Sequence, residues 1–358
     1  MADLTKHVDV IASAIFEQYE KAGANEQART YLGASVIGNE CSRALWYGLR
    51  WAGKEEFNGR MLRLFQTGHL AEPRFVADLR SIGAVVYDTD PATGRQFGFS
   101  DHGGHMRGHM DGCVKNIPGG GLKWHVAEYK THSAKSFTDL KKKGVKAAKP
   151  THYAQMQWYM GKSGMERALY LAVNKDDDDL YSERIEFDQV AFEKLQAKAE
   201  SIIFGQTPPD RISNDPKFYL CNWCPHNAVC HGNRVPAVSC RTCVHSTAER
   251  EGDGRWTCAK GEEKVDIPVE IQRKGCPGHL PLPFLVTYAE PIDAGDGWIR
   301  FQRNDNGTQF VVADNFCTPP SDVPVYTSHE ISAAKDYRAI ADPEIEAVRQ
   351  QYQGRIVG

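Results

Sequence analysis

Two short segments near the middle of the chain constrain its fold most. Residues 107–112 (Arg-Gly-His-Met-Asp-Gly) and residues 127–131 (Ala-Glu-Tyr-Lys-Thr) predict two strands joined by a glycine-rich turn. Side chains two residues apart in a strand point to the same face, so Glu128 and Lys130 project together, and a partner strand can bring Asp111 beside them. Two carboxylates and a lysine at one place can hold a divalent cation and organise an attacking water molecule.

The composition is that of a globular protein with more than one domain. The chain has 358 residues, of which 41% are apolar and 25% charged, and its formal net charge is −3. A nucleic-acid site must therefore rest on a local basic surface and not on overall charge. The sequence has no apolar run long enough to span a membrane and no apolar signal-peptide segment at its start, so we expect a cytoplasmic protein.

A long helix is expected before the two strands. The apolar spacing of residues 60–81 predicts it, and Glu72 and His69 lie on a mostly apolar stretch of that helix. By default each is an exposed polar residue. Beside a metal site that needs a further ligand, either side chain becomes a candidate.

A basic run follows the second strand. It includes Lys141, Lys142 and Lys143, and we expect a mobile loop there. Such a run is usually a solvated surface, but directly after a catalytic strand a contact with a phosphate backbone is about equally expected.

Further elements follow from periodicity and from glycine and proline positions. The helix over 151–161 carries Gln155 and Tyr159, which are four residues apart and so share one face. Strands are expected over 85–87, 95–115, 122–131, 168–173, 182–187, 284–288, 298–301 and 310–312, and helices over 3–22, 188–204 and 343–352, with another helix beginning near residue 41.

The order of these motifs resembles that of the PD-(D/E)XK nuclease superfamily. The similarity is to the branch that holds the RecB nuclease domain, the lambda-type phage exonucleases and the CRISPR-associated RecB-like nucleases, and it covers roughly residues 30–232. The matching motifs are Gly68-His69-x-x-Glu72, Gly108-His109-Met110-Asp111-Gly112, Glu128-Tyr129-Lys130-Thr131 and Gln155-x-x-x-Tyr159.

The resemblance implies an α/β fold with a restriction-endonuclease-like core of α-β-β-β-α order, in which helices flank a mixed central sheet. It also implies Asp111 and Glu128 as ligands of Mg²⁺ or Mn²⁺, with the carbonyl group of Tyr129 completing the set. Lys130 is then the catalytic lysine.

The same resemblance suggests roles for residues outside the two strands. Gln155 and Tyr159 match helix residues that face DNA. Glu72 matches the helix acid of the lambda-type enzymes, whereas some relatives use a histidine there, which leaves His69 as the competing ligand. Arg43 follows a cysteine near the active-site side in the relatives and is a candidate for binding a terminal phosphate, although an isolated arginine usually forms a surface ion pair.

Eight of the ten cysteines fall into two groups, which favours metal or cluster binding over disulfides. In the first group, Cys221-x2-Cys224-x5-Cys230 offers three thiolates, and Cys41 is the nearest earlier cysteine able to supply a fourth. This spacing suits zinc or an iron–sulfur cluster. The resemblance to iron–sulfur members of the superfamily implies a structural [4Fe–4S] cluster.

The second group has the spacing Cys240-x2-Cys243-x14-Cys258-x17-Cys276. A Cys-x2-Cys pair followed by two further cysteines is typical of a structural zinc site. Coordination by four thiolates is favoured over three thiolates and one nearby histidine.

Three parts are expected along the chain. Residues 1–235 form the nuclease domain with its iron–sulfur cluster, residues 236–283 form a cysteine-rich zinc-binding module, and residues 284–358 form a small β-rich region that ends in a helix.

The resemblance implies a metal-dependent DNA exonuclease that acts on linear ends in recombination, repair or phage DNA metabolism, in the host cytoplasm if the protein is phage-encoded. A recombination partner and an oligomeric state are compatible with this role. One alternative is a DNA-trimming nuclease of CRISPR adaptation, which the extra cysteine-rich region disfavours. Another is a non-catalytic DNA-binding scaffold, which the set of Asp111, Glu128 and Lys130 disfavours.

Overall fold

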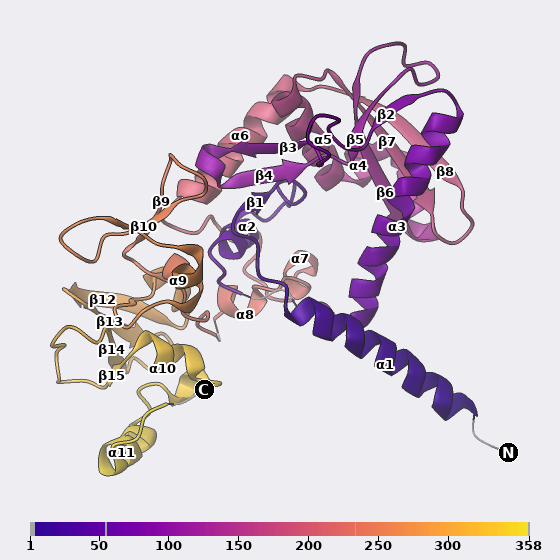
Figure 1. Cartoon of the computed structure of the whole chain (residues 1–358). Helices are drawn as coiled ribbons and strands as arrows, with labels where there is room; N and C mark the ends of the chain where they lie inside the picture. The colour runs from indigo at the N-terminus through magenta and orange to yellow at the C-terminus, as the bar shows by residue number, and fades with distance from the viewer. Residues whose placement is uncertain (1–3, 54–55, 233, 357–358) are drawn as a thin grey trace. The chain divides into compact units, whose positions relative to one another are not determined.

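The computed structural model describes residues 4–53, 56–232 and 234–356. They divide into two compact units, each of which contains distant parts of the sequence (Figure 1). The first unit consists of Met1–Asn39, Glu56–Asp101 and Met106–Ala199, and the second of Glu40–Glu55, His102–His105 and Glu200–Gly358.

The first unit is built on a mixed five-stranded sheet in the order β2-β5-β6-β7-β8. The pair β6 and β7 is parallel and every other pair is antiparallel, so the predicted mixed α/β fold is confirmed. The strands are β2 (Val85–Tyr87), β5 (Gly112–Lys115), β6 (His125–His132), β7 (Arg167–Asn174) and β8 (Leu180–Glu186).

A second sheet of three strands lies in the same unit. In it β4 (Met106–His109) pairs with β1 (Leu32–Gly33) in parallel and with β3 (Gly98–Asp101) in antiparallel fashion. The single strand expected over 95–115 is therefore wrong, because the chain leaves one sheet at His109 and enters the other at Gly112. The N–H of Tyr129 donates its hydrogen bond to the side-chain carboxylate of Asp111 and not to the backbone of that residue. The backbone pairing between β5 and β6 therefore begins only at Gly112.

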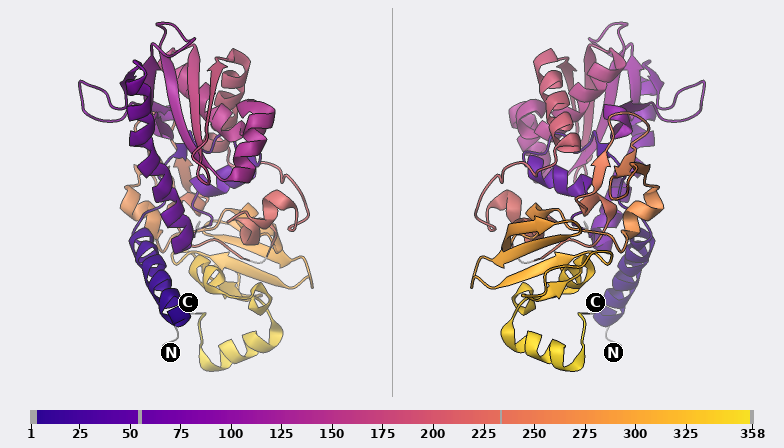
Figure 2. Two further views of the ribbon diagram at one scale, coloured as in Figure 1. Left: turned by 90° about the vertical axis from the view of Figure 1, so that its right-hand side faces the viewer. Right: turned by 90° about the vertical axis from the view of Figure 1, so that its left-hand side faces the viewer.

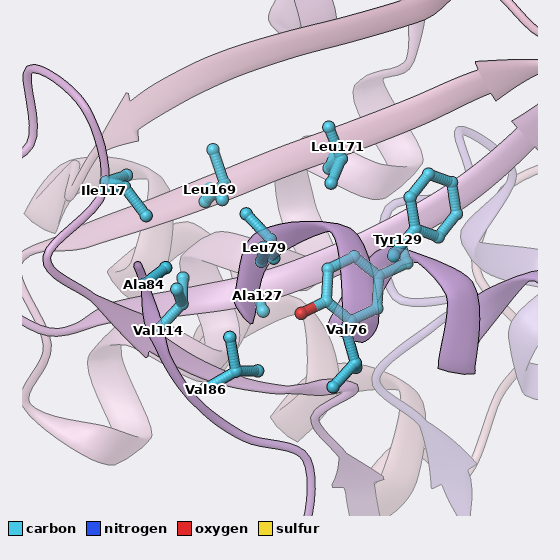
Figure 3. Packing of buried hydrophobic residues seen from close by; sticks show 11 residues of the cluster. Val76, Leu79, Ala84, Val86, Val114, Ile117, Ala127, Tyr129, Leu169 and Leu171 are labelled. Carbon is cyan, nitrogen blue, oxygen red and sulfur yellow. The ribbon is translucent and has the colours of Figure 1, made fainter. Parts of the chain in front are cut away.

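Helix α3 (Gly59–Ser81) covers one face of the five-stranded sheet and makes the core of this unit. It starts at Asn58, whose side chain accepts the N–H of Met61, and it continues through Pro73. Burial of each large apolar side chain in this core contributes about 1.5–3 kcal/mol. The cluster, most of which Figure 3 labels, comprises Phe75, Val76, Leu79, Ala84, Val86, Val114, Ile117, Ala127, Tyr129, Leu169 and Leu171.

The opposite face of the sheet is covered by α4 (Ala134–Ala148) and α5 (Pro150–Ser163), as Figure 2 shows. The loop expected for the basic run is wrong, since Lys141 to Lys143 belong to α4. This helix forms because Phe137, Leu140 and Val145 are buried on its inner side. The unit also contains α1 (Leu4–Ala24), which packs against α3, and most of α6 (Gln189–Phe204).

The second unit holds two small antiparallel-rich sheets and short helices. One sheet has the order β11-β10-β9 and the other β12-β13-β14-β15. The strand expected over 284–288 is wrong, because Pro283 opens a 3₁₀ turn there and the strand begins at Ala289. The strands are β9 (Ser246–Ala248), β10 (Trp256–Cys258), β11 (Val265–Asp266), β12 (Ala289–Gly295), β13 (Trp298–Arg303), β14 (Gln309–Ala313) and β15 (Val325–Tyr326).

The helices of the second unit are short. The last one begins where Asp342 caps two N–H groups and Pro343 occupies the first helical position, which confirms the expected helix over 343–352. Across the described ranges, no helix has both the length and the apolar character needed to cross a membrane. The α-helices are α2 (Ser42–Leu49), α7 (Tyr219–Asn222), α8 (Asn227–Cys230), α9 (Val269–Lys274), α10 (Ser328–Ala333) and α11 (Pro343–Tyr352), and the 3₁₀ helices are η1 (His102–Gly104), η2 (Cys240–Thr242), η3 (Pro283–Leu285) and η4 (Tyr337–Ala339).

Candidate active site

Asp111 is fixed at the bend between β4 and β5. Its Oδ2 accepts the main-chain N–H of Tyr129 at 2.8 Å, which connects the bend to the neighbouring strand β6. This hydrogen bond uses one carboxylate oxygen and sets the direction in which the other one points.

Glu128 lies on β6 and faces away from the α3 core, because its neighbours Ala127 and Tyr129 face that core. Its side chain is fully buried, and neither carboxylate oxygen accepts a hydrogen bond, although one of them forms an ion pair with Lys130. Burial raises the pKa of Glu128 to about 7, even though Lys130 acts to lower it. A buried carboxylate without hydrogen-bond donors is costly, and this carboxylate is therefore well suited to ligate a cation.

The Lys130 ammonium group lies among three oxygen atoms. It donates a hydrogen bond to the Tyr129 carbonyl at 3.1 Å, it lies 3.7 Å from Asp111 Oδ2, and it pairs with Glu128. Burial lowers the pKa of Lys130, but the negative charges of Glu128 and Asp111 raise it by a larger amount. The net pKa therefore lies above the ordinary value. A positive charge thus occupies the point where the three expected metal-ligand oxygens converge.

These residues fit a hard divalent cation. Two carboxylates and a main-chain carbonyl are the oxygen donors that Mg²⁺ and Mn²⁺ prefer. The Lys130 ammonium already shows that the three oxygens stabilise a cation. Among the residues that the structure describes, no group of three or more histidine, cysteine, aspartate or glutamate side chains has the arrangement of a ready metal site.

Glu72 of α3 faces this centre. Burial raises the pKa of Glu72, and the negative charge of Asp111 raises it further, whereas Lys130 lowers it. Glu72 therefore lies within electrostatic range of both residues. His69, whose side chain is 78% exposed, has its Nδ1 3.3 Å from Glu72 Oε1, so it contacts Glu72 on the solvent side.

Gln155 and Tyr159 of α5 support the centre from the face of the sheet toward which Glu128 points. The Tyr159 hydroxyl donates to the carbonyl oxygen of His109 at 2.6 Å, and Gln155 forms a side-chain hydrogen bond with that hydroxyl. Both side chains are buried, and the DNA-facing role that the family resemblance implies stays a prediction. A Cβ atom at Gly108 would lie 2.8 Å from the Tyr159 oxygen, so the close approach of this helix depends on glycine.

Two histidines near the centre have no role in the sequence-based prediction. His132 follows Lys130 by two residues in β6, and His152 precedes Gln155 by three residues in α5. The signal was present in the spacing: His132 continues the face of Glu128 and Lys130, and His152 continues the face of Gln155 and Tyr159.

The four cysteines of the first group all belong to the second unit. Burial raises the pKa of Cys224, and the thiols of Cys41, Cys230 and Cys221 raise it further, so the four sulfur atoms lie within electrostatic range of one another. None of the ten cysteines forms a disulfide.

The four cysteines of the second group are near one another as well. Burial raises the pKa of Cys240 to about 12, and Cys276, Cys243 and Cys258 contribute to that shift in this order. Cys243 is buried, and burial raises its pKa also.

The expected DNA contacts fall at two different places. Arg43 belongs to the second unit, where it donates to Tyr47 at 3.0 Å and to the Pro209 carbonyl at 2.8 Å. On α4 of the first unit, Lys141 pairs with Asp179 and Lys143 with Asp139, both at 2.8 Å, while Lys142 is exposed. The phosphate contacts of these residues stay predictions.

Several solved structures are similar to this chain. The crystal structure of SSO0001 is 15% identical, with a TM-score of 0.37, and the match covers 62% of this chain and 96% of that one. For LHK-Exo in complex with dAMP the identity is 18% and the TM-score 0.34, and for LHK-Exo alone, an alkaline exonuclease from Laribacter hongkongensis, they are 16% and 0.31, with 52% of this chain and 90% of that chain covered in each case. All three TM-scores are below 0.5, so these similarities support no statement about the function of this chain.

Sequence comparison gives a clearer result. No curated protein matches this sequence at a significant level. The family model of the PD-(D/E)XK nuclease superfamily matches residues 12–231, which is more than half of the chain, and the chain therefore belongs to that superfamily.

Proposed function

We propose that this protein is a metal-dependent DNA exonuclease that hydrolyses phosphodiester bonds at DNA ends in recombination, repair or phage DNA metabolism, as a member of the RecB-like and lambda-exonuclease-like branch. The observation that carries the proposal is the convergence of Asp111, Glu128 and the Tyr129 carbonyl on the Lys130 ammonium. A nuclease needs oxygen ligands and a lysine at one place, and this role uses all four groups together.

Asp111, Glu128 and the Tyr129 carbonyl would hold Mg²⁺ or Mn²⁺, with Glu72 as the further acid. When bound, the ion would stabilise charge on the phosphate and lower the pKa of a water molecule. The positive charge of Lys130 lowers the pKa of Glu128 against the larger effect of burial, and so favours the ionised form whose oxygens would bind the metal ion. Tyr159 keeps the His109 backbone in place, and with it the direction of Asp111.

Lys130 acts as a cation in this arrangement. Glu128 and Asp111 raise the pKa of Lys130, so its amine stays protonated at neutral pH as long as these carboxylates do not bind a metal ion. Its role is then to bind the scissile phosphate and orient the attacking water molecule.

We also propose that the two cysteine groups bind metal. Cys41, Cys221, Cys224 and Cys230 would hold a [4Fe–4S] cluster, and Cys240, Cys243, Cys258 and Cys276 would hold Zn²⁺. The support is that, in each group, the other three cysteines lie close enough to raise the pKa of the fourth, which is Cys224 in the first group and Cys240 in the second. Each centre would join segments far apart in sequence, which is a structural role.

The test of the nuclease activity uses a linear duplex labelled at the 5′ or 3′ end, compared with a closed circular duplex of the same sequence. We expect Mg²⁺- or Mn²⁺-dependent release of nucleotides from the linear substrate alone, and loss of this release in Glu128→Ala and Lys130→Ala. Glu166→Ala and Lys123→Ala are matched controls, because they remove an exposed ion pair of the same unit, 2.6 Å long, and should leave the rate unchanged.

Two results would contradict the proposal. Full activity in either active-site variant would remove the assigned chemistry, and equal cleavage of closed and linear DNA would exclude an exonuclease. Binding of DNA without cleavage under any divalent cation would favour the non-catalytic scaffold instead.

A further inference from the structure

A chain of hydrogen bonds runs beside the candidate active site, entirely within the first unit. Lys149 Nζ donates to Ser136 Oγ at 2.6 Å, and that hydroxyl lies 3.2 Å from His132 Nδ1. His132 Nε2 lies 2.8 Å from the Tyr170 hydroxyl, which in turn lies 2.9 Å from His152 Nδ1. Four contacts thus connect the end of α4 to the start of α5 through β6 and β7.

The direction of this chain follows from its first member. An ammonium group only donates, so Ser136 Oγ accepts from Lys149 and has its own proton to give to His132 Nδ1. A neutral His132 then carries its proton on Nε2 and donates to Tyr170. The Tyr170 hydroxyl donates to His152 Nδ1, which leaves the proton of His152 on Nε2.

Both imidazoles are held neutral, as this direction requires. Burial, together with the charges of Lys149, Lys130 and Lys175, lowers the pKa of His132 to about 4. For His152, burial lowers the pKa to about 3, with further contributions from Lys130, His132 and Lys149. Lys130 and Lys149 lower the pKa of both rings, whereas the carboxylate of Glu128 acts on the Tyr170 hydroxyl between them.

The chain of hydrogen bonds ends at His152 Nε2. In the described part of the chain, no hydrogen-bond partner is recorded for His152 Nε2, and the side chain is only half-buried, whereas Tyr170 and His132 are buried. His152 lies on the face of α5 that carries Gln155 and Tyr159, and it lies within electrostatic range of Lys130. A neutral N–H donor within electrostatic range of a lysine that is proposed to bind phosphate suits a second phosphate group of the same nucleic-acid strand.

We propose that His152 is a phosphate-binding residue, whose Nε2–H donates to a non-bridging oxygen of the DNA backbone next to the phosphodiester that Lys130 contacts. This inference rests on the proposed nuclease function. Tyr170, His132, Ser136 and Lys149 are positioning residues, because they act on DNA only by fixing the proton of His152 on Nε2.

The first test measures DNA binding and cleavage separately. A fluorescent linear duplex is titrated in Ca²⁺, which permits binding without cleavage, and cleavage is then followed at saturating DNA in Mg²⁺. We expect His152→Ala to weaken binding about 10-fold to 100-fold, the range for one hydrogen bond to a charged group, while the rate at saturation changes by only a few-fold. His152→Gln retains a donor near Nε2 and should restore most of the affinity.

The second test reads the proton position directly. Long-range ¹H–¹⁵N spectra of the full chain should show His152 protonated at Nε2 and not at Nδ1. Tyr170→Phe should mix the two tautomers and weaken DNA binding, whereas Tyr181→Phe, which removes another tyrosine hydroxyl from the same sheet, should change neither.

Each outcome decides one of the two claims. Wild-type affinity in folded His152→Ala, or a His152 protonated at Nδ1 in the wild type, would overturn the role of His152. If wild-type protein neither cleaves nor binds DNA while the expected tautomer is observed, the nuclease proposal fails and the assigned ligand of His152 fails with it, but the hydrogen-bond chain stands.

Discussion

The carboxylate of Asp111 accepts a hydrogen bond from the main-chain N–H of Tyr129 at 2.8 Å, so the acid at the bend before β5 is oriented by the backbone of β6. The same residue Tyr129 turns its carbonyl toward Lys130, at 3.1 Å. One peptide segment of β6 thus orients both an acid and the lysine of the candidate site.

Replacing Asp111 by asparagine separates the charge of this residue from its hydrogen bond. Asp111→Asn keeps an oxygen that can accept the N–H of Tyr129, so we expect the melting temperature to change little. The missing charge should weaken Mn²⁺ binding and reduce cleavage on the order of 100-fold or more. Calorimetric Mn²⁺ titration and the end-labelled assay measure the two effects, with Asp139→Asn on the surface of α4 as the control. Unchanged Mn²⁺ affinity would contradict the assignment of Asp111 as a ligand.

Removing the Tyr159 hydroxyl tests whether its hydrogen bond to the His109 backbone stabilises the candidate site. Tyr159→Phe loses the 2.6 Å hydrogen bond to the His109 carbonyl, which should lower the free energy of unfolding by about 0.5–1.5 kcal/mol. Since the His109 backbone leads to Asp111, the cleavage rate should fall as well. Denaturant unfolding and the cleavage assay measure both quantities. Tyr153→Phe on the same helix removes a longer bond, 3.3 Å, to Asp188, and should affect only stability, and only slightly.

The pH dependence of stability should carry the signature of Glu128. Its pKa is about 7 in the folded protein because of burial, against an ordinary value of 4.5, so the folded state binds the proton more tightly than the unfolded state. The stabilisation from this proton is fully present below about pH 4.5 and is lost as the pH rises through about 7, by at most about 3 kcal/mol.

Glu128→Gln isolates this contribution from the other titrating groups. Without added Mg²⁺ or Mn²⁺, the free energy of unfolding of the wild type minus that of Glu128→Gln should decrease between pH 4.5 and pH 7. Saturating Mn²⁺ should reverse the trend, because a ligand that binds the ionised carboxylate stabilises the folded state at high pH. A difference that stays constant over this range would exclude the raised pKa.

The two cysteine groups should respond independently to substitution. We expect Cys224→Ser to lower the iron and sulfide content of anaerobically purified protein and leave zinc unchanged, and Cys258→Ser to do the reverse. Elemental analysis and the visible absorption spectrum measure this. Cys317→Ser is the control because Cys317 belongs to neither group. Iron and zinc that are lost together, or neither of them present in the wild type, would contradict two separate centres.

Local patterns were sufficient to predict most elements. The helix over 343–352 was predicted with its observed bounds because Asp342 and Pro343 mark its start in the sequence itself. Helix α4 was missed because its lysines suggested a solvated loop. Lys141 pairs with Asp179, which is distant in sequence, and only the folded chain reveals this partner.

The candidate site was predictable in its members more than in its arrangement. The spacing of Glu128 and Lys130 followed from the period of a strand. Asp111 was expected within a strand, but it lies at the bend where the chain changes sheets, and such a change depends on pairing between segments that are far apart in sequence. The chain from Lys149 to His152 has the same origin, since Tyr170 joins its two histidines from a different strand.

The parallel pairing of β6 with β7 also determines when the site can form during synthesis. Two adjacent parallel strands need a crossover, and here the crossover consists of α4 and α5. A nascent chain that has just completed β6 already contains Glu72, Asp111, Glu128 and Lys130, but it lacks Tyr159 and the strand that pairs with Glu128 on its other side. The ribosome must add more than thirty further residues, through Asn174, before β7 can pair with β6 and Glu128 is buried, so we expect a fragment released earlier to lack the complete candidate site.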